Sequence, residues 1–473
     1  MKSAYRNSFL LSNGAIVCDW ITFNAAIAIC DACGWWALFH EGYLVSPQWL
    51  VFNISFVISK VFIQSTYHHR WSTIASILRN AFLSSATTVL FNSAILGMSH
   101  MGVPGFLRSL TLFAVIFLLT FLVRVLLRQA IRHIRYRGHD PIYAVIIGKE
   151  RLAKGVIRVM NNKWNGYCLL GVFDDRSGEE TEQPADGEDG IPPLTWLGGV
   201  KDARQWVENN DINEVYICLD RGESEAVKPL LMLCARRMIR VFYIPHGDIT
   251  YSRYAQMKEF GDTYVIAMYN EPLMDTGKRI LKRTFDICFS AAFLCLLFPL
   301  IFVVVAIITK ITMPGPIFFK QKRTGYDGKE FYCYKFRSMK VNSSSDTLQA
   351  TKDDDRITKW GHILRHTNID ETPQFWNVLI GDMSVVGPRP HMLAHTEYYG
   401  KLISNYMVRH YVRPGITGWA QVMGERGETS TVDDMSRRVE KDIWYIEHWS
   451  FWLDLQIMLM TILKCFTNDK KAY

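Results

Sequence analysis

The stretch FDICFSAAFLCLLFPLIFVVVAIITK, from Phe285 to Lys310, decides the class of fold, because it is long and apolar enough to cross a bilayer. Basic residues lie on both sides of it: Lys278, Arg279, Lys282 and Arg283 before, and Lys310, Lys320, Lys322 and Arg323 at its end and beyond. Basic flanks favour the cytoplasm, so both ends are expected there. Pro299 removes a helix hydrogen bond near the middle. We predict a re-entrant helix that breaks at Pro299. The alternative is that this segment crosses the membrane, as a fifth span after the four described below, which would place everything after residue 310 outside the cytoplasm.

The first third of the 473-residue chain carries four further apolar stretches of spanning length, at about 15–39, 46–66, 80–102 and 106–128. Basic residues follow the second and the fourth, which places those ends, and the rest of the chain, in the cytoplasm. Asp31 and Lys60 interrupt the first two stretches; we expect Lys60 to snorkel outward and Asp31 to face neighbouring helices. No cleavable signal peptide is expected, because the first apolar run is long and aromatic residues follow it.

The composition argues against several classes of protein. The ten cysteines are scattered, and the pair Cys30 and Cys33 lies in an apolar stretch without a second ligand pair, so neither a zinc site nor a disulfide framework is predicted. The net charge of +8 does not indicate nucleic-acid binding, since the arginines cluster at the edges of apolar stretches and around the motifs described below. Anionic lipids and phosphate ligands account for them better.

Alternating strand and helix patterns over about 140–245 predict a Rossmann-like parallel α/β domain. Its segments are YAVIIG, RLAKGVIRVMNN, LLGVFDD, INEVYICLD and IRVFYIP. A dinucleotide-binding turn reads G-x-G-x-x-G, but here the turn is GKERLAKG: Gly148 is kept, and Glu150 replaces the second glycine and adds negative charge where a phosphate would lie. We therefore expect a structural or regulatory domain without a redox cofactor.

The last third contains YKFRSM (334–339), DDDRITKWGHILRHTNIDE (353–371), GPRP (387–390) and VRPGITGWAQV (412–422). Each holds a cation, and together these residues would be costly to bury unless they met anions: Lys335, Arg337, Arg365, Arg389 and Arg413. Guanidinium groups match phosphate oxygens bidentately, so we predict a phosphate-binding site. The acidic run 353–355, His391 and His395 are interpreted as solvated, surface or structural residues.

Adjacent carboxylates lie in NIDETPQFWNVLIGDMSVVGPRPH (368–391). Asp370 fits a helix N-cap, with Glu371 and Pro373 in the first turn and Gly381 at the end. A helix N-terminus also attracts phosphate and keeps an aspartate ionised, as a nucleophile requires. When a carboxylate attacks a phosphoanion, two unit charges about 4 Å apart repel each other by roughly 4 kcal/mol in a medium with an effective dielectric constant of about 20. Mg²⁺ held by Asp370 and Glu371 would offset it.

KRTFDI, YKFRSM, IDETPQFWNVLIGDMSVVGPRPH and VRPGITGWAQV closely resemble the bacterial polyprenyl-phosphate hexose-1-phosphate transferases that initiate exopolysaccharide and O-antigen assembly. The resemblance implies that Asp370 attacks the β-phosphate of a UDP-sugar, expels UMP and passes the sugar phosphate to undecaprenyl phosphate. Glu371 would assist Mg²⁺ binding, and the phosphates would be held by Arg365 and Arg389, with Lys335, Arg337 and Arg413 contributing. Pro299 matches the break of the family's re-entrant helix, although Phe298 stands where many members have serine, and DETPQ replaces the commoner DELPQ.

The family implies a protein of the bacterial cytoplasmic membrane with three parts: a four-helix transmembrane domain (1–137), a Rossmann-like domain (138–270) and a re-entrant helix with a catalytic domain at the cytoplasmic interface (271–473). The segment DIWYIEHWSFWLDLQIMLMTILKCF near the end mixes aromatic and charged residues, so it is expected to lie in the interface. A homodimer is a further expectation from the family.

UDP-glucose is the expected donor, because GERGETST after GWAQV resembles members that transfer glucose-1-phosphate; UDP-galactose, for O-antigen, remains the alternative. Two other classes stay open. A membrane nucleotide-sugar dehydratase would need an intact glycine turn and a Tyr-x-x-x-Lys pair, which the α/β region lacks. A non-catalytic assembly scaffold would need neither Asp370 nor a metal.

Overall fold

The protein forms two compact units in the computed structural model: Met1–Val227 with Val241–Met268, and Lys228–Arg240 with Tyr269–Tyr473. The structure describes residues 4–33, 47–63, 70, 72–95, 103–175, 194–218, 224–245, 256–261, 263–340, 356–425 and 431–466. The acidic run 353–355 and most of GERGETST therefore lie outside the described residues. The three predicted domain boundaries stay predictions, and each unit is described by itself.

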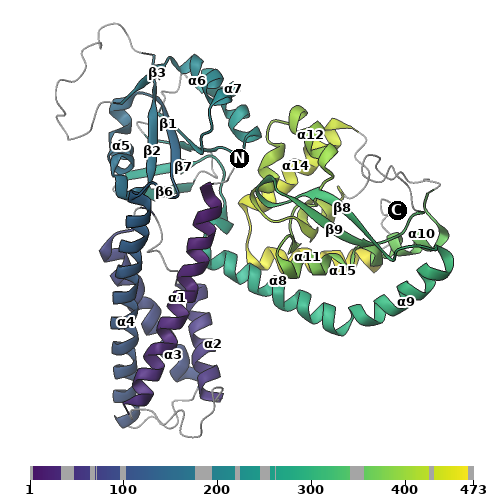
Figure 1. The fold of residues 1–473 in the computed structure, drawn as a ribbon, viewed down its shortest axis with the longest axis horizontal. Coiled ribbons are helices and arrows are strands. Elements are labelled where there is room, and N and C mark those ends of the chain that lie inside the picture. Colours follow the sequence, from purple (N-terminus) through teal and green to yellow (C-terminus); the bar gives the residue numbers. More distant parts are fainter. Residues whose placement is uncertain are drawn as a thin grey trace. The chain divides into compact units, whose positions relative to one another are not determined.

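Four helices open the first unit (Figure 1): α1 (Ala4–Ala32), α2 (Pro47–Phe62), α3 (Ile74–Ile95) and α4 (Val103–Tyr136). α4 packs on α1 and α3, and α3 packs on α2. Three of them are long and apolar enough to cross a membrane, over Gly14–Ala32, Ile74–Ala94 and Ser109–Tyr136, while the apolar part of α2 is the shorter Trp49–Lys60. A membrane-associated protein is thus confirmed, and a fourth crossing stays a prediction. α3 begins six residues before the stretch predicted to start at 80.

A buried ion cluster joins all four helices. The Nζ atom of Lys60 donates to Asp19 Oδ2 at 2.7 Å and to the Ser84 hydroxyl at 3.3 Å. Arg124 donates to both oxygens of Asp19, at 3.1 and 2.9 Å. All four side chains are buried. The expectation that Lys60 snorkels outward is therefore wrong: a carboxylate on α1 gives its ammonium group a partner inside the bundle, where an unpaired charge is expensive. Asp31 is half-buried at the end of α1.

The sheet of the first unit has seven strands in the order β3-β2-β1-β4-β5-β7-β6. Their bounds are β1 (Ile142–Gly148), β2 (Tyr167–Phe173), β3 (Trp196–Gly198), β4 (Glu214–Cys218), β5 (Arg240–Tyr243), β6 (Gln256–Phe260) and β7 (Thr263–Ala267). β1 pairs in parallel with β2 and β4, as the alternating pattern predicted. β7 pairs antiparallel with β5 and β6, an extension that the prediction lacked. The α/β helices are α5 (Lys154–Asn161), α6 (Ala203–Asn209) and α7 (Ser224–Arg236).

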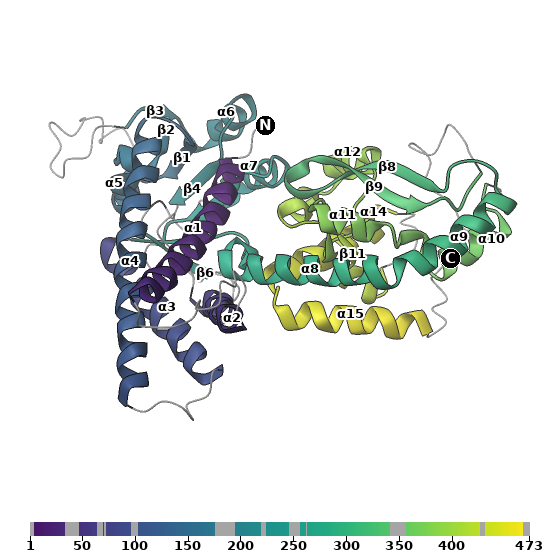
Figure 2. The same cartoon turned by 60° about the horizontal axis from the view of Figure 1, so that its bottom comes forward.

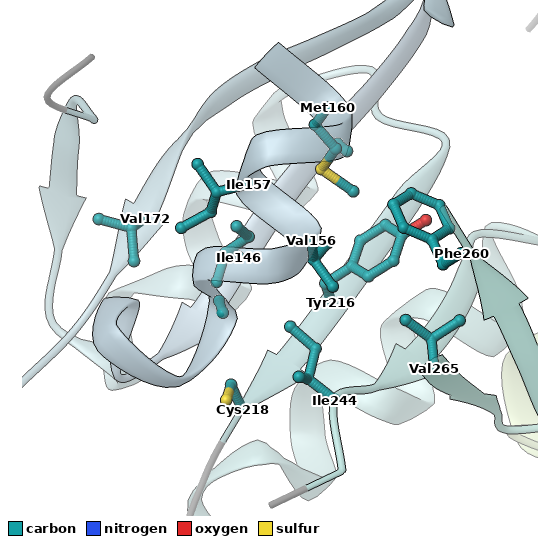
Figure 3. Close-up of a cluster of buried hydrophobic side chains, with 12 residues drawn as sticks. Ile146, Val156, Ile157, Met160, Val172, Tyr216, Cys218, Ile244, Phe260 and Val265 are labelled. Carbon is teal, nitrogen blue, oxygen red and sulfur yellow. The ribbon is translucent and has the colours of Figure 1, made fainter. Parts of the chain in front are cut away.

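The core of the α/β domain forms where α5 packs on this sheet. Figure 3 shows Val156, Ile157 and Met160 of α5 facing Ile146 of β1 and Tyr216 of β4, all at most 1% exposed. The turn after β1 is tied to the neighbouring strand, because the N–H of Lys149 donates to the Cys218 carbonyl at 3.1 Å. Gly148 has φ +104°, a left-handed conformation that favours glycine. The predicted absence of a redox cofactor stays a prediction.

In the second unit, two helices meet at a bend of 53°: α8 (Thr276–Leu296) and α9 (Phe298–Thr312) (Figure 2). The break falls at Leu297, two residues before the predicted Pro299, which lies in the first turn of α9. A proline is tolerated there because its missing N–H would have had no helical partner. The bend fits either a broken span or a re-entrant pair, so the re-entrant topology stays a prediction.

α8 begins nine residues before the apolar stretch. The basic residue Lys282 in this part of the helix makes buried contacts within the unit, in addition to flanking the apolar stretch. The Nζ atom of Lys282 lies 2.6 Å from Asp454 Oδ2 and donates to the Val386 carbonyl at 2.9 Å. Asp286 accepts hydrogen bonds from the hydroxyl of Ser384 and the N–H of Val385, at 2.8 and 3.0 Å. These buried contacts attach α8 to the strand that precedes GPRP.

After α9, the unit contains four strands and six α-helices among the described residues. Its strands are β8 (Phe318–Thr324) and β9 (Glu330–Phe336), an antiparallel hairpin, and β10 (Ser384–Val386) and β11 (Gly415–Thr417), a parallel pair. Its helices are α10 (Lys359–His366), α11 (Gln374–Ile380), α12 (Leu393–Leu402), α13 (Trp419–Val422), α14 (Val432–Glu447) and α15 (Phe451–Phe466). α15 buries Asp454 and Ile457 but exposes Trp452 and Leu459, the amphipathic pattern of an interfacial helix.

The ion cluster of the helix bundle makes a stability prediction. Replacing Asp19→Asn removes the carboxylate that pairs with the buried Lys60 and Arg124, and breaking a buried ion pair costs about 3–5 kcal/mol. The purified protein in mild detergent should therefore unfold at a clearly lower added SDS concentration than the parent, as followed by tryptophan fluorescence. Asp31→Asn on the same helix is the control and should change little. Equal unfolding of Asp19→Asn and the parent would show that the cluster contributes no net stability.

Candidate active site

Asp370 and Glu371 lie side by side in a short 3-10 turn, Ile369–Glu371, and are 7% and 9% exposed. Asn368 starts the turn in a left-handed conformation with φ +57°. The predicted N-cap role of Asp370 is wrong, because Pro373 occupies the cap position and α11 begins at Gln374. Asparagine tolerates this conformation better than most non-glycine residues, and the 3-10 turn follows it directly. The predicted end of α11 at Gly381 is confirmed, with φ +103°.

The Glu371 carboxylate is held by two cations from distant segments. Lys335 of β9 donates from Nζ to Oε1 at 2.6 Å. Arg389, which follows β10, donates from Nη2 to Oε1 at 2.6 Å and from Nη1 to Oε2 at 3.2 Å. Burial by itself raises the pKa of Glu371, but the charges of Arg389 and Lys335 hold this pKa well below its usual value. Glu371 is therefore ionised at neutral pH.

Asp370 is in the opposite electrostatic situation. Its carboxylate makes no hydrogen bond to another group in the part of the chain that the structure describes. Burial raises its pKa to about 6, Lys335 opposes the rise, and the charge of Glu371 adds to it. Two adjacent carboxylates with pKa values shifted in opposite directions divide the chemical roles between them. Glu371 is a fixed anion, and Asp370 is a carboxylate that lacks a bonding partner and is mostly ionised at pH 7.

The five predicted phosphate-binding cations divide into two groups. The charges of Lys335, Arg365 and Arg389 all act on Asp370. Arg365, in the last turn of α10, donates from Nε to the Ser338 hydroxyl at 3.0 Å. These three residues are the ones that the structure gathers around the carboxylate pair.

Arg337 and Arg413 bind backbone carbonyl groups instead. Arg337 donates from Nε to the Pro316 carbonyl at 2.6 Å and from Nη2 to that of Met313. Arg413 donates from Nε to the Gly381 carbonyl at 2.9 Å, at the end of α11 opposite the carboxylates. Their contacts secure the chain after α9 and the C-terminus of α11, and a phosphate contact for either residue stays a prediction.

Comparison with known proteins identifies the family. The profile described as "Bacterial sugar transferase" matches residues 277–468, and the one described as "CoA-binding domain" matches residues 62–245. The UDP-glucose:undecaprenyl-phosphate glucose-1-phosphate transferase of Escherichia coli (strain K12) is 35% identical over 415 residues, 86% of each chain. The protein belongs to the bacterial sugar transferase family. The predicted resemblance is thus confirmed.

Two other relatives of this sugar transferase differ in the sugar they are named for. The UDP-glucose:undecaprenyl-phosphate glucose-1-phosphate transferase of Xanthomonas campestris pv. campestris is 38% identical over 74% of this chain and 72% of its own length. The UDP-N-acetylgalactosamine-undecaprenyl-phosphate N-acetylgalactosaminephosphotransferase of Aeromonas hydrophila is 37% identical over 50% of this chain and 55% of its own. The family's common reaction type therefore accommodates more than one sugar.

The carboxylate pair fits the predicted Mg²⁺. Among the described residues, no three His, Cys, Asp or Glu side chains form a group that could hold a metal by themselves. Mg²⁺ does not need such a cage, because it keeps several waters and binds one or two carboxylates together with substrate phosphates. Asp370 offers carboxylate oxygens without a hydrogen-bond partner among the described residues, and Glu371 lies next to it.

The sequence analysis of the sugar transferase named His391 as a structural or surface residue but missed Arg409 and Asp442. Arg409 and Asp442 form a buried ion pair with 2.6 Å between Nη2 and Oδ2. His391 is buried against Tyr406 and Arg409, and burial with the nearby charge of Arg409 holds its pKa well below the usual value. One signal was available: Asp442 lies on the apolar stripe of α14 with Met435, Val439 and Ile443, where a charge requires a partner.

The raised pKa of Asp370 makes a prediction about stability. The folded protein keeps this proton up to about pH 6, whereas the unfolded chain loses it near pH 4. The folded state binds more protons in that window, so the free energy of unfolding falls there as pH rises, by at most about 1.4 kcal/mol per pH unit. Asp370→Asn lacks this loss, so it should become progressively more stable than the parent between pH 4 and 6.

The measurement is denaturant unfolding of both proteins at pH 4, 5, 6 and 7, in EDTA so that no divalent ion lowers the pKa of Asp370. Asp433→Asn removes an exposed carboxylate from α14 and serves as the control. Parallel pH profiles for Asp370→Asn and the parent would show that the Asp370 carboxyl group has an ordinary pKa.

Proposed function

We propose that this protein transfers hexose-1-phosphate from a UDP-sugar to undecaprenyl phosphate, giving undecaprenyl-diphosphate-hexose and UMP. The observation that carries the proposal is the carboxylate pair: Glu371 is fixed by Lys335 and Arg389, and Asp370 is left without a hydrogen-bond partner among the described residues. The same reaction type is named for relatives that are alike over most of the chain. This step begins the membrane stage of exopolysaccharide or capsule synthesis.

Asp370 is the proposed nucleophile. One of its oxygens attacks the β-phosphorus of the UDP-sugar; the bond to the bridging oxygen breaks, and its electron pair leaves with UMP. An oxygen of undecaprenyl phosphate then attacks the sugar-phosphoryl aspartate and releases the carboxylate. Each step brings an anion to a phosphate, with a repulsion of roughly 4 kcal/mol for unit charges about 4 Å apart. The charges of Lys335, Arg365 and Arg389 around Asp370 counter this repulsion.

Asp370 and Glu371 would hold Mg²⁺. Bound there, the ion would neutralise charge on the phosphates and act as a Lewis acid. The side chains themselves position the charges: Glu371 keeps Lys335 and Arg389 beside Asp370, and Arg365 adds a third cation.

UDP-glucose is the proposed donor, since the relatives that share most of this chain are named for glucose. UDP-galactose for O-antigen is the alternative. The dehydratase reading is disfavoured by Glu150 in the turn after β1. A non-catalytic scaffold would be unaffected by changes at Asp370.

The activity test is UMP release by purified protein with undecaprenyl phosphate and Mg²⁺ from UDP-glucose, UDP-galactose and UDP-N-acetylgalactosamine. Release should be fastest with UDP-glucose, fall at least about 10³-fold in Asp370→Asn and fall strongly in Glu371→Gln, with EDTA abolishing it. Arg437→Lys, on the exposed side of α14, is the control. Without the lipid acceptor, the parent should release at most one UMP per site.

UMP release that is equal in Asp370→Asn and the parent would remove the nucleophile role. No UMP from any sugar would favour the scaffold. A preference for UDP-galactose would keep the reaction and replace the donor.

We further propose that the protein lies in the bacterial cytoplasmic membrane with α8 and α9 re-entrant and the catalytic unit on the cytoplasmic side. The bend at Leu297 and the exposed apolar faces of α9 and α15, including Leu300, Ile311 and Trp452, support contact with lipid. The four-span topology and the family's homodimer belong to the same proposal. A shallow site at this interface lets a soluble nucleotide sugar meet a lipid-borne phosphate.

Cysteine labelling in intact cells tests the topology, in a variant whose ten native cysteines are replaced. Lys322→Cys, beyond α9, should react with a permeant maleimide but not with an impermeant one, because both ends of the bent pair stay inside. Arg204→Cys, on the exposed side of α6, is the matched cytoplasmic position. Labelling of Lys322→Cys alone by the impermeant reagent would mean that α8 and α9 cross the membrane.

A further inference from the structure

Arg409 lies in the segment Tyr406–Tyr411 and is 2% exposed. Its Nη2 atom donates to Asp442 Oδ2 at 2.6 Å and to the backbone carbonyl of Arg389 at 2.9 Å. One guanidinium group thus joins a buried carboxylate of α14 to the backbone of the residue whose side chain holds Glu371. Arg409 makes no contact of its own with the carboxylate pair that the structure records.

The same guanidinium contacts a second residue of the loop. Its Nη1 atom lies closest to Nδ1 of His391 and 3.0 Å from Nε2 of the same ring. The low pKa of His391, caused by burial and by the charge of Arg409, keeps the ring neutral, so a ring nitrogen accepts the hydrogen bond. Tyr406, three residues before Arg409, has its hydroxyl oxygen 2.6 Å from Nδ1 of the same ring. Arg409 therefore holds the loop at Arg389 and at His391, on both sides of Pro390.

The loop has little freedom left between these points. The carbonyl of Pro390 accepts a hydrogen bond from Nη1 of Arg323 at 2.6 Å. Gly387 at the start of the loop donates to the Thr417 carbonyl at 2.9 Å and has the Arg413 carbonyl 2.4 Å from the position of an added Cβ. The backbone that carries the Arg389 side chain is thus fixed by Arg409 at residue 389 itself, with the Arg323 and Gly387 contacts on either side of it.

We propose that Arg409 and Asp442 are positioning residues for the reaction: they fix the backbone of Arg389 so that its guanidinium meets both oxygens of Glu371 beside the nucleophile. This inference rests on the proposed function of the site. A buried ion pair is a poor source of stability, since apolar residues of similar volume often stabilise as well or better. The Arg409–Asp442 pair instead fixes the position of the Arg389 backbone. Small displacements of a charged group beside a reacting site lower the rate strongly.

Arg409→Lys tests the proposal while keeping the fold. Lysine keeps the positive charge opposite Asp442, but a single ammonium group cannot reproduce the planar fork that reaches Asp442, the Arg389 carbonyl and His391 together. The kcat for UMP release from UDP-glucose should fall about 10- to 100-fold, with the unfolding midpoint changed little. Arg437→Lys, the same substitution at an exposed position of α14, should leave kcat unchanged.

A double-mutant cycle separates positioning from a general structural role. If Arg409 acts through Arg389, Arg409→Lys should lower kcat less than about threefold when Arg389→Lys is already present. The reason is that the effects of substitutions at coupled neighbouring residues are not additive. The same 10- to 100-fold cost in both backgrounds would overturn the proposal, and so would a wild-type kcat for Arg409→Lys alone.

Hydrogen–deuterium exchange gives a readout that does not depend on activity. Backbone amides of residues 384–391 should exchange faster in Arg409→Lys than in the parent and in Arg437→Lys. If the parent releases no UMP, the proposed function fails. The exchange result still reports whether Arg409 holds the loop at Arg389 and His391. Unchanged exchange in Arg409→Lys would show that Arg409 does not hold this loop.

Discussion

The contact between Glu371 and the cations Lys335 and Arg389 is the interaction on which the site depends. It brings together strand β9, the 3-10 turn before α11 and the loop after β10, three segments that are separate in the sequence. Its neighbour Asp370 has no hydrogen-bond partner among the described residues, and burial, with a further contribution from the charge of Glu371, raises its pKa. One carboxylate of the pair is thus fixed by cations while the adjacent one is not, an arrangement that hydrophobic packing could not produce.

Buried ion pairs recur wherever elements must be held in one arrangement. Asp19 joins the helices of the bundle, Lys282 joins α8 to α15 through Asp454, and Arg409 joins the Arg389 loop to α14 through Asp442. Burying each ion pair costs desolvation free energy. In return, the geometry of the pair restricts how the two elements are oriented more than apolar contacts do. In the second unit, Lys282 and Arg409 also donate to the backbone carbonyls of Val386 and Arg389, on the segment that carries Arg389.

About the fold, the periodicity and the flanking charges indicated apolar helices followed by an α/β domain, and the bend between α8 and α9 was expected within two residues of its position. The start of α11 was misplaced because a 3-10 turn, Ile369–Glu371, comes between the left-handed Asn368 and the helix. Lys60 was misread for a related reason: its partner Asp19 lies 41 positions away. Local patterns carry no information about such partners.

The sequence by itself determined the family, the parallel part of the sheet, the carboxylate pair and the set of cations from which the site is built, since residue type and short spacing encode these. Only the tertiary structure decided which cations serve the pair: Lys335, Arg365 and Arg389 act on Asp370, whereas Arg337 and Arg413 bind backbone carbonyls. It also supplied Arg409 and Asp442. The reason is physical: every arginine can bind an anion, and the fold alone determines which anion or carbonyl lies within reach of its guanidinium group.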